Sequence, residues 1–272
     1  MSAGAFFLAG ADQPDEVRDL RDAIAGRGWV DDVLVGNDTL ALLWAGSASG
    51  FGVAVVVGAG VNGVGRAESG IEAHFAALGD VTGDWGGGPG IGLAALGAAV
   101  RAEEGRAPAT ALSALIAAHF GERTAVDVAI AVQRGRIAGH RLGELPPLVF
   151  EAAQRGDADS LAMIDRQADE VVAFAVAALR RTEQTDDDVE VILGGSVLAS
   201  GPTRLIDRVR AGVAAIAPRA KVVLWTGRPV LGAAIAVLNV SGADDAARLR
   251  LRAELTDDRI TVLGDAPGGE AR

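Results

Sequence analysis

The sequence contains no cysteine. This absence excludes disulfides, thiolate zinc sites and iron–sulfur clusters held by cysteines. Aromatic residues make up only 4% of the chain, although half of it is hydrophobic, so the core must be built mainly from Ala, Val, Leu and Ile. A chain of 272 residues is long enough for one large domain or for two lobes.

Basic residues are scarce relative to acidic ones. The chain has 25 Lys and Arg against 36 Asp and Glu, which gives a formal net charge of −11. A surface this acidic repels phosphate backbones and anionic membranes, so we expect neither nucleic acid nor a membrane as a partner. No apolar run reaches the roughly 20 residues of a membrane span, and residues 1–12 lack the basic start of a signal peptide. We expect a soluble, cytoplasmic protein.

Strand patterns alternate with helical patterns along the chain. Apolar runs typical of strands lie at 5–12, 31–38, 51–60, 61–67, 189–196 and 220–225. Helical patterns lie at 14–28, 39–46, 86–100, 109–120, 158–184, from about 202, and at 229–238, and the chain after about 240 is charged and loosely patterned. This alternation predicts an α/β fold with ligand sites at the ends of strands.

A glycine motif follows the apolar run at 51–57. Gly58, Gly60 and Gly63 have the spacing G-x-G-x-x-G of a dinucleotide-binding turn. A helix should begin at the third glycine, but residues 64–70 have no helical period. The pattern therefore favours a strand–turn–strand hairpin, either a plain one or one that presents backbone N–H groups to an anion.

Three further segments place polar residues or glycines where a strand or loop meets a helix. Asn37 and Asp38 follow a strand; either could cap the next helix, but the end of a central strand is also where α/β folds keep catalytic groups. Asp84 precedes the glycines 86–88 and could cap a helix, hold a sugar hydroxyl or meet a metal, while Trp85 could stack on a sugar. The glycines 86–88 and the helix after them would offer free N–H groups to a ligand.

The sequence "ILGGSV" ends the strand pattern at 189–196. Gly194 and Gly195 allow close approach of a flat group such as a purine, with Ser196 beginning the next segment; the alternative is an ordinary strand-to-helix turn.

The order of these motifs carries more information than any one of them. The series "LAGAD…VGND…VVVGAGVN…GDWGGG…ILGGSV…RPVLGAA" over residues 5–238 resembles the BadF/BadG/BcrA/BcrD-type ATPases, in the branch of N-acetylglucosamine kinases. The resemblance implies a two-lobed, ribonuclease-H-like fold of the actin and sugar-kinase ATPases, with ATP and sugar in a cleft. It places a partial N-terminal lobe at 1–46, joined by 239–272, and a C-terminal lobe at 47–238.

The resemblance also assigns roles to residues. Asp38 matches the family's general base, and Asp84 matches an aspartate that helps to bind the sugar. Asn37, Asp38 and Trp85 are the other residues predicted to bind it. Gly58, Gly60 and Asn62 match the second phosphate loop. The adenosine motif is matched by Gly194, Gly195 and Ser196. ATP and Mg²⁺ are the implied cofactors, with Mg²⁺ carried by the nucleotide and no metal site in the protein, and a homodimer is the implied assembly. The glycines 86–88 would let the two lobes approach each other.

Two departures from the family pattern stand out. The family's first phosphate loop, of the type Asp-Gly-Gly-x-Thr, has no counterpart, so the N-terminal lobe is expected to lack its first three strands. Either the start codon is assigned too late or the chain is truncated, or the protein is short and binds without phosphorylating. In the second loop, Ala59 and Val61 replace the Thr and Ser of Gly-Thr-Gly-Ser-Asn.

The sequence therefore predicts an ATP-dependent kinase of an amino sugar, N-acetylglucosamine or glucosamine, acting at the 6-hydroxyl. The first alternative is a non-catalytic sugar- or nucleotide-binding regulator. A dehydratase-activating ATPase of the same family needs cysteines for its cluster, which this chain lacks. A Rossmann dehydrogenase requires the helix that the motif at 58–63 does not have.

Overall fold

The computed structural model describes residues 2–255, and the chain forms two compact units. Unit 1 combines Met1–Gly50 with Gly227–Arg272, and unit 2 is Phe51–Thr226. The lobe boundaries expected from the resemblance, after residues 46 and 238, stay a prediction, and part of the segment 239–272 lies outside the described residues.

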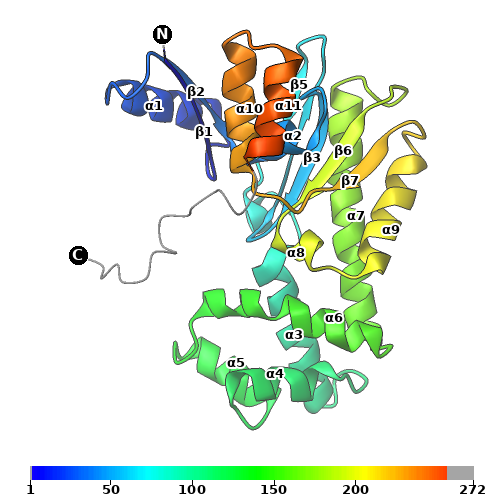
Figure 1. Ribbon diagram of the computed structural model, residues 1–272. Coiled ribbons are helices and arrows are strands. Elements are labelled where there is room, and N and C mark those ends of the chain that lie inside the picture. Colours follow the sequence, from blue (N-terminus) through cyan, green and yellow to red (C-terminus); the bar gives the residue numbers. More distant parts are fainter. Residues whose placement is uncertain (1, 256–272) are drawn as a thin grey trace. The chain divides into compact units, whose positions relative to one another are not determined.

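A five-stranded mixed sheet in the order β5–β4–β3–β6–β7 forms the centre of unit 2 (Figure 1). The strands are β3 (Gly52–Val57), β4 (Val61–Arg66), β5 (Glu72–His74), β6 (Glu190–Gly194) and β7 (Lys221–Leu224). β3 and β4 are an antiparallel hairpin in which Val57 lies opposite Val61. This confirms the hairpin and rules out a dinucleotide-binding turn. β6 runs parallel to β3, so both strands end at the same edge of the sheet.

Helices cover the sheet of unit 2 and extend it at one end. The segments are η1 (Gly79–Val81), α3 (Gly87–Glu103), α4 (Leu112–Phe120), α5 (Ala125–Gln133), η2 (Gly139–Glu144), α6 (Pro146–Gln154), α7 (Ala158–Arg181), α8 (Ser196–Ala199) and α9 (Thr203–Ala214). The long α7 runs from the layer formed by α3–α6 up along the sheet (Figure 1). One continuous hydrophobic core joins the strands to this helical layer.

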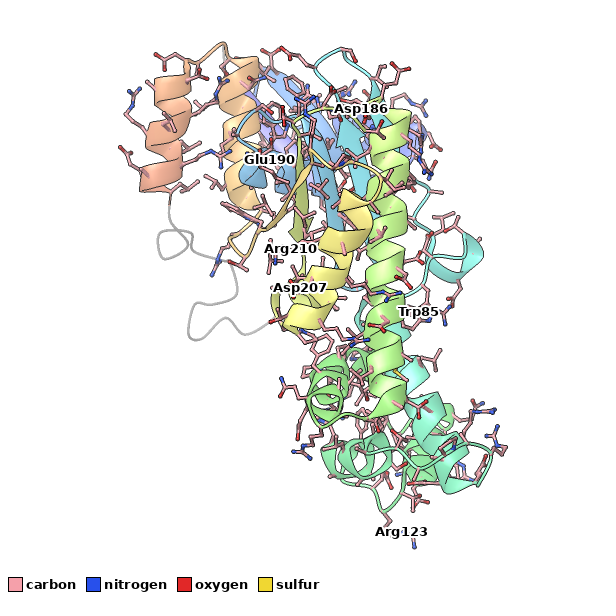
Figure 2. All side chains as sticks on the ribbon, turned by 90° about the vertical axis from the view of Figure 1, so that its right-hand side faces the viewer. Trp85, Arg123, Asp186, Glu190, Asp207 and Arg210 are labelled. Atoms are coloured by element: carbon pink, nitrogen blue, oxygen red, sulfur yellow. The ribbon has the colours of Figure 1, made fainter. Side chains whose placement is uncertain are left out.

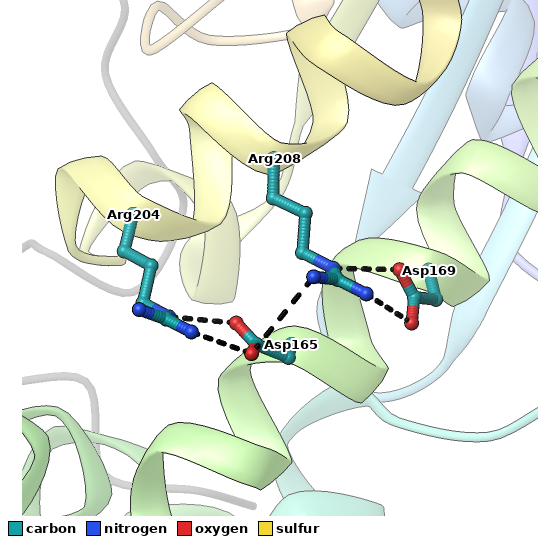
Figure 3. A network of polar contacts seen from close by, with 4 residues as sticks. All are labelled: Asp165, Asp169, Arg204 and Arg208. Carbon is teal, nitrogen blue, oxygen red and sulfur yellow. Dashed lines mark hydrogen bonds and ion pairs between the residues drawn. The ribbon is translucent and has the colours of Figure 1, made fainter.

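α7 and α9 lie side by side and are joined by a ladder of charges (Figure 3). Arg204 makes a bidentate bond to Asp165, with distances of 2.7 and 2.6 Å. One turn further along, Arg208 makes the same contact with Asp169 at 2.7 and 2.9 Å. Spacing of four residues on both helices places the two pairs on one seam.

Unit 1 has a smaller, two-stranded parallel sheet. Its elements are β1 (Ala3–Leu8), α1 (Pro14–Ala25), β2 (Asp32–Asn37), α2 (Asp38–Gly46), α10 (Val230–Val240) and α11 (Asp245–Glu254). α10 packs against α2. Arg252 of α11 donates hydrogen bonds to the carbonyls of Trp44, Ala45 and Ser47, at the end of α2. Two distant parts of the sequence therefore build this unit together.

The strands and helices predicted from the sequence pattern are present, with ends that differ by a few residues. The elements not predicted as separate segments are β5, the 3-10 helices η1 and η2, α5, α6, the short α8 and α11. The prediction of a loosely patterned chain after residue 240 was wrong for α11. Its apolar face is weak, and it gains its stability from the Asp244 cap and the contacts of Arg252 instead.

Candidate active site

A pocket of about 470 Å³ opens in unit 2 at the edge where β3 and β6 end. The loop of the β3–β4 hairpin, the start of α3, the junction of η2 with α6, and α8 form its walls. The lining residues are Gly58, Ala59, Gly88, Pro89, His140, Gly143, Glu144, Pro146, Pro147, Ser196, Val197 and Ser200. Ligands of α/β proteins bind beyond the carboxyl ends of strands, which is the position of this pocket.

The hairpin loop gives the pocket backbone donors. The Gly58 N–H donates to the Gly60 carbonyl at 2.9 Å, which closes the turn. The N–H groups of Ala59 and Gly60 have no acceptor among residues 2–255. Free amides in a tight turn are suited to phosphate oxygens.

The start of α3 differs from the expectation that it offers free amides. The Gly87 N–H donates to Oε1 of Gln167 at 3.0 Å, and the Gly88 N–H donates to the Gly58 carbonyl at 2.7 Å. The next residue, Pro89, has no N–H to offer. The Gly87 and Gly88 amides are therefore used within unit 2, and the prediction was wrong for these two residues.

The glycines at this helix start are needed for packing inside unit 2. Gly87 has a φ of +66°, and a Cβ there would lie 2.8 Å from the Cα of Gly60. A Cβ on Gly88 would lie 3.2 Å from the carbonyl oxygen of Gly143, on the other wall of the pocket. The contacts that require Gly87 and Gly88 lie within unit 2. A role of the glycines 86–88 in the approach of two lobes stays a prediction.

Asp84 and Trp85 lie in the loop before α3. Asp84 does not cap α3, whose N-cap is Gly86; its carboxylate accepts from the Thr82 hydroxyl at 2.5 Å. The backbone N–H of Trp85 donates to the carboxylate of Glu170, on α7, at 3.3 Å. The guanidinium of Arg166 lies 4.2 Å from the centre of the Trp85 ring, which stands beside α7 (Figure 2). One face of this ring is therefore covered, and sugar binding by both residues stays a prediction.

The glycines at the end of β6 are explained in part by the sheet. Gly194 pairs with Val56 of β3. Gly195 has a φ of +97°, and a Cβ there would overlap the carbonyl of Val57. The close approach of β3 is thus sufficient to explain why this position is a glycine. Among the residues predicted to bind nucleotide, Gly58 and Ser196 line the pocket, while Gly60 lies in the turn beside it.

Asn62 has a position in the hairpin rather than in the lining of the pocket. It lies on β4, and its side-chain oxygen accepts from the Gly63 N–H at 2.7 Å. A role for Asn62 in nucleotide binding remains a prediction.

A charged cluster stands at the wall formed by η2. Glu144 accepts two bonds from Arg141, at 2.8 and 2.9 Å, and lies 2.8 Å from the imidazole of His119. These contacts, chiefly the one from Arg141, lower the pKa of Glu144 to about 2. The carboxylate is therefore charged at every physiological pH. Neither Glu144 nor His140, which also lines the pocket, belonged to the residues predicted from the sequence.

Asn37 and Asp38 lie in unit 1, at the junction of β2 and α2. Asn37 is the N-cap of α2: its side-chain oxygen accepts from the N–H and the hydroxyl of Thr39, at 2.9 and 2.6 Å. Its amide nitrogen donates to Asp12 at 2.7 Å. Asp38 is the first residue of the helix and is half-buried, and burial raises the pKa of its carboxyl. A raised pKa suits a group that accepts a proton near neutral pH.

Comparison with known proteins places this chain in a family. The sequence model of the BadF/BadG/BcrA/BcrD ATPase family matches residues 6–236. The N-acetylmuramic acid/N-acetylglucosamine kinase of Clostridium acetobutylicum is 25% identical over 227 residues, covering 84% of this chain and 74% of the relative. The N-acetyl-D-glucosamine kinase of Dictyostelium discoideum is 24% identical over 230 residues, covering 80% and 72%.

Solved structures give the same fold. A candidate N-acetylglucosamine kinase from Chromobacterium violaceum superposes with a TM-score of 0.63 at 22% identity, covering 87% of this chain and 75% of the other. Within residues 2–255, no helix has the length and hydropathy needed to cross a membrane. The chain, with the α/β fold of the actin-like sugar-kinase ATPases, belongs to the BadF/BadG/BcrA/BcrD ATPase family.

Proposed function

We propose that the protein is an ATP-dependent kinase that phosphorylates an amino sugar, N-acetylglucosamine or glucosamine, at the 6-hydroxyl. The observation that carries this proposal is the pocket at the ends of β3 and β6, which is bounded by a hairpin loop with free amides. The names of the two curated relatives, both kinases of N-acetylglucosamine, support the choice of substrate.

ATP occupies the pocket with its phosphates toward the hairpin loop. The Ala59 and Gly60 amides are available there as donors, whereas the Glu144 carboxylate, on the wall formed by η2, is held by Arg141 and offers phosphate no donor. Pro146, Pro147 and Val197 offer apolar surface for a base. In this proposal Mg²⁺ arrives bound to the phosphates of the nucleotide.

Asp38 is the general base. It accepts the proton of the sugar hydroxyl as the oxygen attacks the terminal phosphorus of ATP and ADP leaves. Its carboxyl is half-buried, and burial raises its pKa, so the carboxylate binds a proton more strongly than an exposed one would. Asn37, Asp84 and Trp85 complete the proposed sugar contacts, with Asn37 also fixing the start of the helix that carries Asp38.

The test is ADP release on addition of N-acetylglucosamine or glucosamine to the protein with Mg-ATP. We expect sugar-dependent release that falls by at least about a hundredfold in Asp38→Asn, the range that a general base contributes. Asp32→Asn, at the exposed start of β2, the strand that leads to Asp38, is the matched control and should keep full activity. Full activity of Asp38→Asn would remove Asp38 from the catalytic role.

A second candidate function is binding of sugar or nucleotide without transfer. It is favoured by Ala59 and Val61, which leave the hairpin loop without hydroxyl groups for phosphate. Protection from thermal unfolding by sugar or ADP, together with no ADP release, would support this function over the kinase. The proposed homodimer is tested separately by light scattering of the purified chain, and the proposed cytoplasmic location by fractionation.

A further inference from the structure

Gln167 is a buried polar residue on the apolar face of α7. Its side chain is only 1% exposed, and it lies between Ile164 and Val171, which both belong to the core. Spacing of three and four residues along a helix defines the face that packs inward, and that face is normally apolar. A buried amide there requires a reason, because it costs free energy unless its hydrogen bonds are made.

Only one end of this amide is satisfied. Oε1 accepts the Gly87 N–H at 3.0 Å, while Nε2 is buried with no partner among the described residues. Since the group facing Oε1 is a backbone donor, the orientation of the amide is fixed. Methionine could fill the same space without a buried unpaired donor, so packing alone does not account for glutamine at this position.

The contact with Gly87 continues into the hairpin loop. Gly88, the next residue of α3, donates to the Gly58 carbonyl at 2.7 Å. Gly87 itself lies so close to the loop that a Cβ would approach the Gly60 Cα to 2.8 Å. The start of α3 thus touches both glycines of the turn, and displacement of Gly87 displaces the turn that carries the free Ala59 and Gly60 amides.

We propose that Gln167 is a positioning residue that holds the hairpin loop in the shape that binds nucleotide phosphates. It acts through Gly87 and Gly88 rather than by touching the nucleotide. The inference rests on the proposed function, because it needs the phosphates to be bound at the loop 58–60. It adds a residue of α7, more than a hundred positions along the chain from the loop, to the nucleotide site.

The experiment compares the affinities of ADP and adenosine in two variants. Gln167→Met removes the acceptor for Gly87 at nearly constant volume. Ser160→Ala is the matched control, because Ser160 is also fully buried on α7 and also loses a side-chain hydrogen bond, to Asp157. Competition against a fluorescent ADP analogue, calibrated separately for each protein, gives both dissociation constants.

We expect Gln167→Met to weaken ADP by about tenfold, which corresponds to one lost well-placed contact. Adenosine, which has no phosphate, should change by less than about twofold. Ser160→Ala should bind both ligands like the unaltered protein. Should the methionine variant not fold, Gln167→Asn takes its place, since its amide is one methylene too short to reach Gly87.

The outcomes separate this inference from the function on which it rests. An unaltered protein that does not bind ADP would overturn both. If the unaltered protein binds ADP, but Gln167→Met weakens ADP and adenosine equally or weakens neither, the positioning role alone is overturned. Hydrogen exchange without ligand adds a direct reading: the Gly87 amide should exchange faster in Gln167→Met and not in Ser160→Ala.

Discussion

The two units of the chain differ in how their candidate residues are supported. In unit 2, each wall of the pocket is joined to another wall or to α7 by backbone contacts, above one continuous core. In unit 1, the sheet has two strands, β1 is only partly buried along its whole length, and α1 and α11 have no buried residue. The pocket therefore belongs to the better-packed unit, while Asp38 depends on a few contacts around α2.

The largest expected effect comes from cavities made in the two units. Leu193 of β6 and Leu43 of α2 are both 0% exposed, so each Leu→Ala change should cost about 2–5 kcal/mol. Leu193→Ala should weaken ADP binding, whereas Leu43→Ala should spare it and lower sugar-dependent activity. Calorimetric unfolding and ADP titration measure the two effects, with the 67% exposed Leu249→Ala as control. Equal loss of ADP binding in both variants would contradict the contrast between the units.

A single methyl group in the pocket wall tests the backbone packing of unit 2. Gly87→Ala should weaken ADP by about tenfold, because its φ is positive and the new Cβ would press on Gly60. Gly90→Ala, in the same helix turn, is the control, since nothing lies within 4 Å of its added Cβ. Titration with ADP decides, and equal affinities of the two variants would show that the helix start can move without disturbing the loop.

In unit 1, the pH dependence of Asp38 provides a third comparison. Burial raises the pKa of this carboxyl, so the folded state binds its proton more tightly than the unfolded state does. Its contribution to stability is therefore present at low pH and is lost as pH rises through the raised pKa. Asp38→Asn should consequently melt higher than the unaltered protein at pH 7, with the difference shrinking in acid. Melting curves at pH 4 to 8 would show this, and a gap that grows in acid would contradict it.

The smallest effect is expected from the ladder between α7 and α9 (Figure 3). Its side chains reach solvent, with 50% of Arg204 and 25% of Asp165 exposed, so a double-mutant cycle of these two residues should give no more than about 1 kcal/mol. Salt at about 1 M should remove most of that coupling. Chemical unfolding of the four proteins at low and high salt measures it. A coupling that survives high salt would mean that the ladder acts as a buried network.

The sequence predicted the elements better than the contacts between them. The hairpin at 51–66 could be foreseen because the residues after Gly63 lack a helical period, and Asn37 was recognised as a possible cap. The use of the α3 amides could not be foreseen. They bond to Gln167 and Gly58, which lie 80 and 30 residues away, and no local pattern encodes such a pair.

The candidate site shows the same limit. Gly58 and Ser196 were found because glycine turns after strands leave a local signature. His140 and Glu144 reach the pocket from a 3-10 helix whose position depends on the packing of the whole helical layer. Gln167 did leave a signal, a polar residue within an apolar stripe, but that signal alone does not name its partner.

The discontinuous make-up of unit 1 has a consequence for the order in which the protein matures on the ribosome. The segment Met1–Gly50 is synthesised before unit 2, but α2 can contact α10 and Arg252 only when these have emerged after unit 2. All of unit 2 is made in the meantime and can fold as a body, as domains generally do during synthesis. The unit that carries Asp38 can therefore be completed only after all of unit 2 has been synthesised.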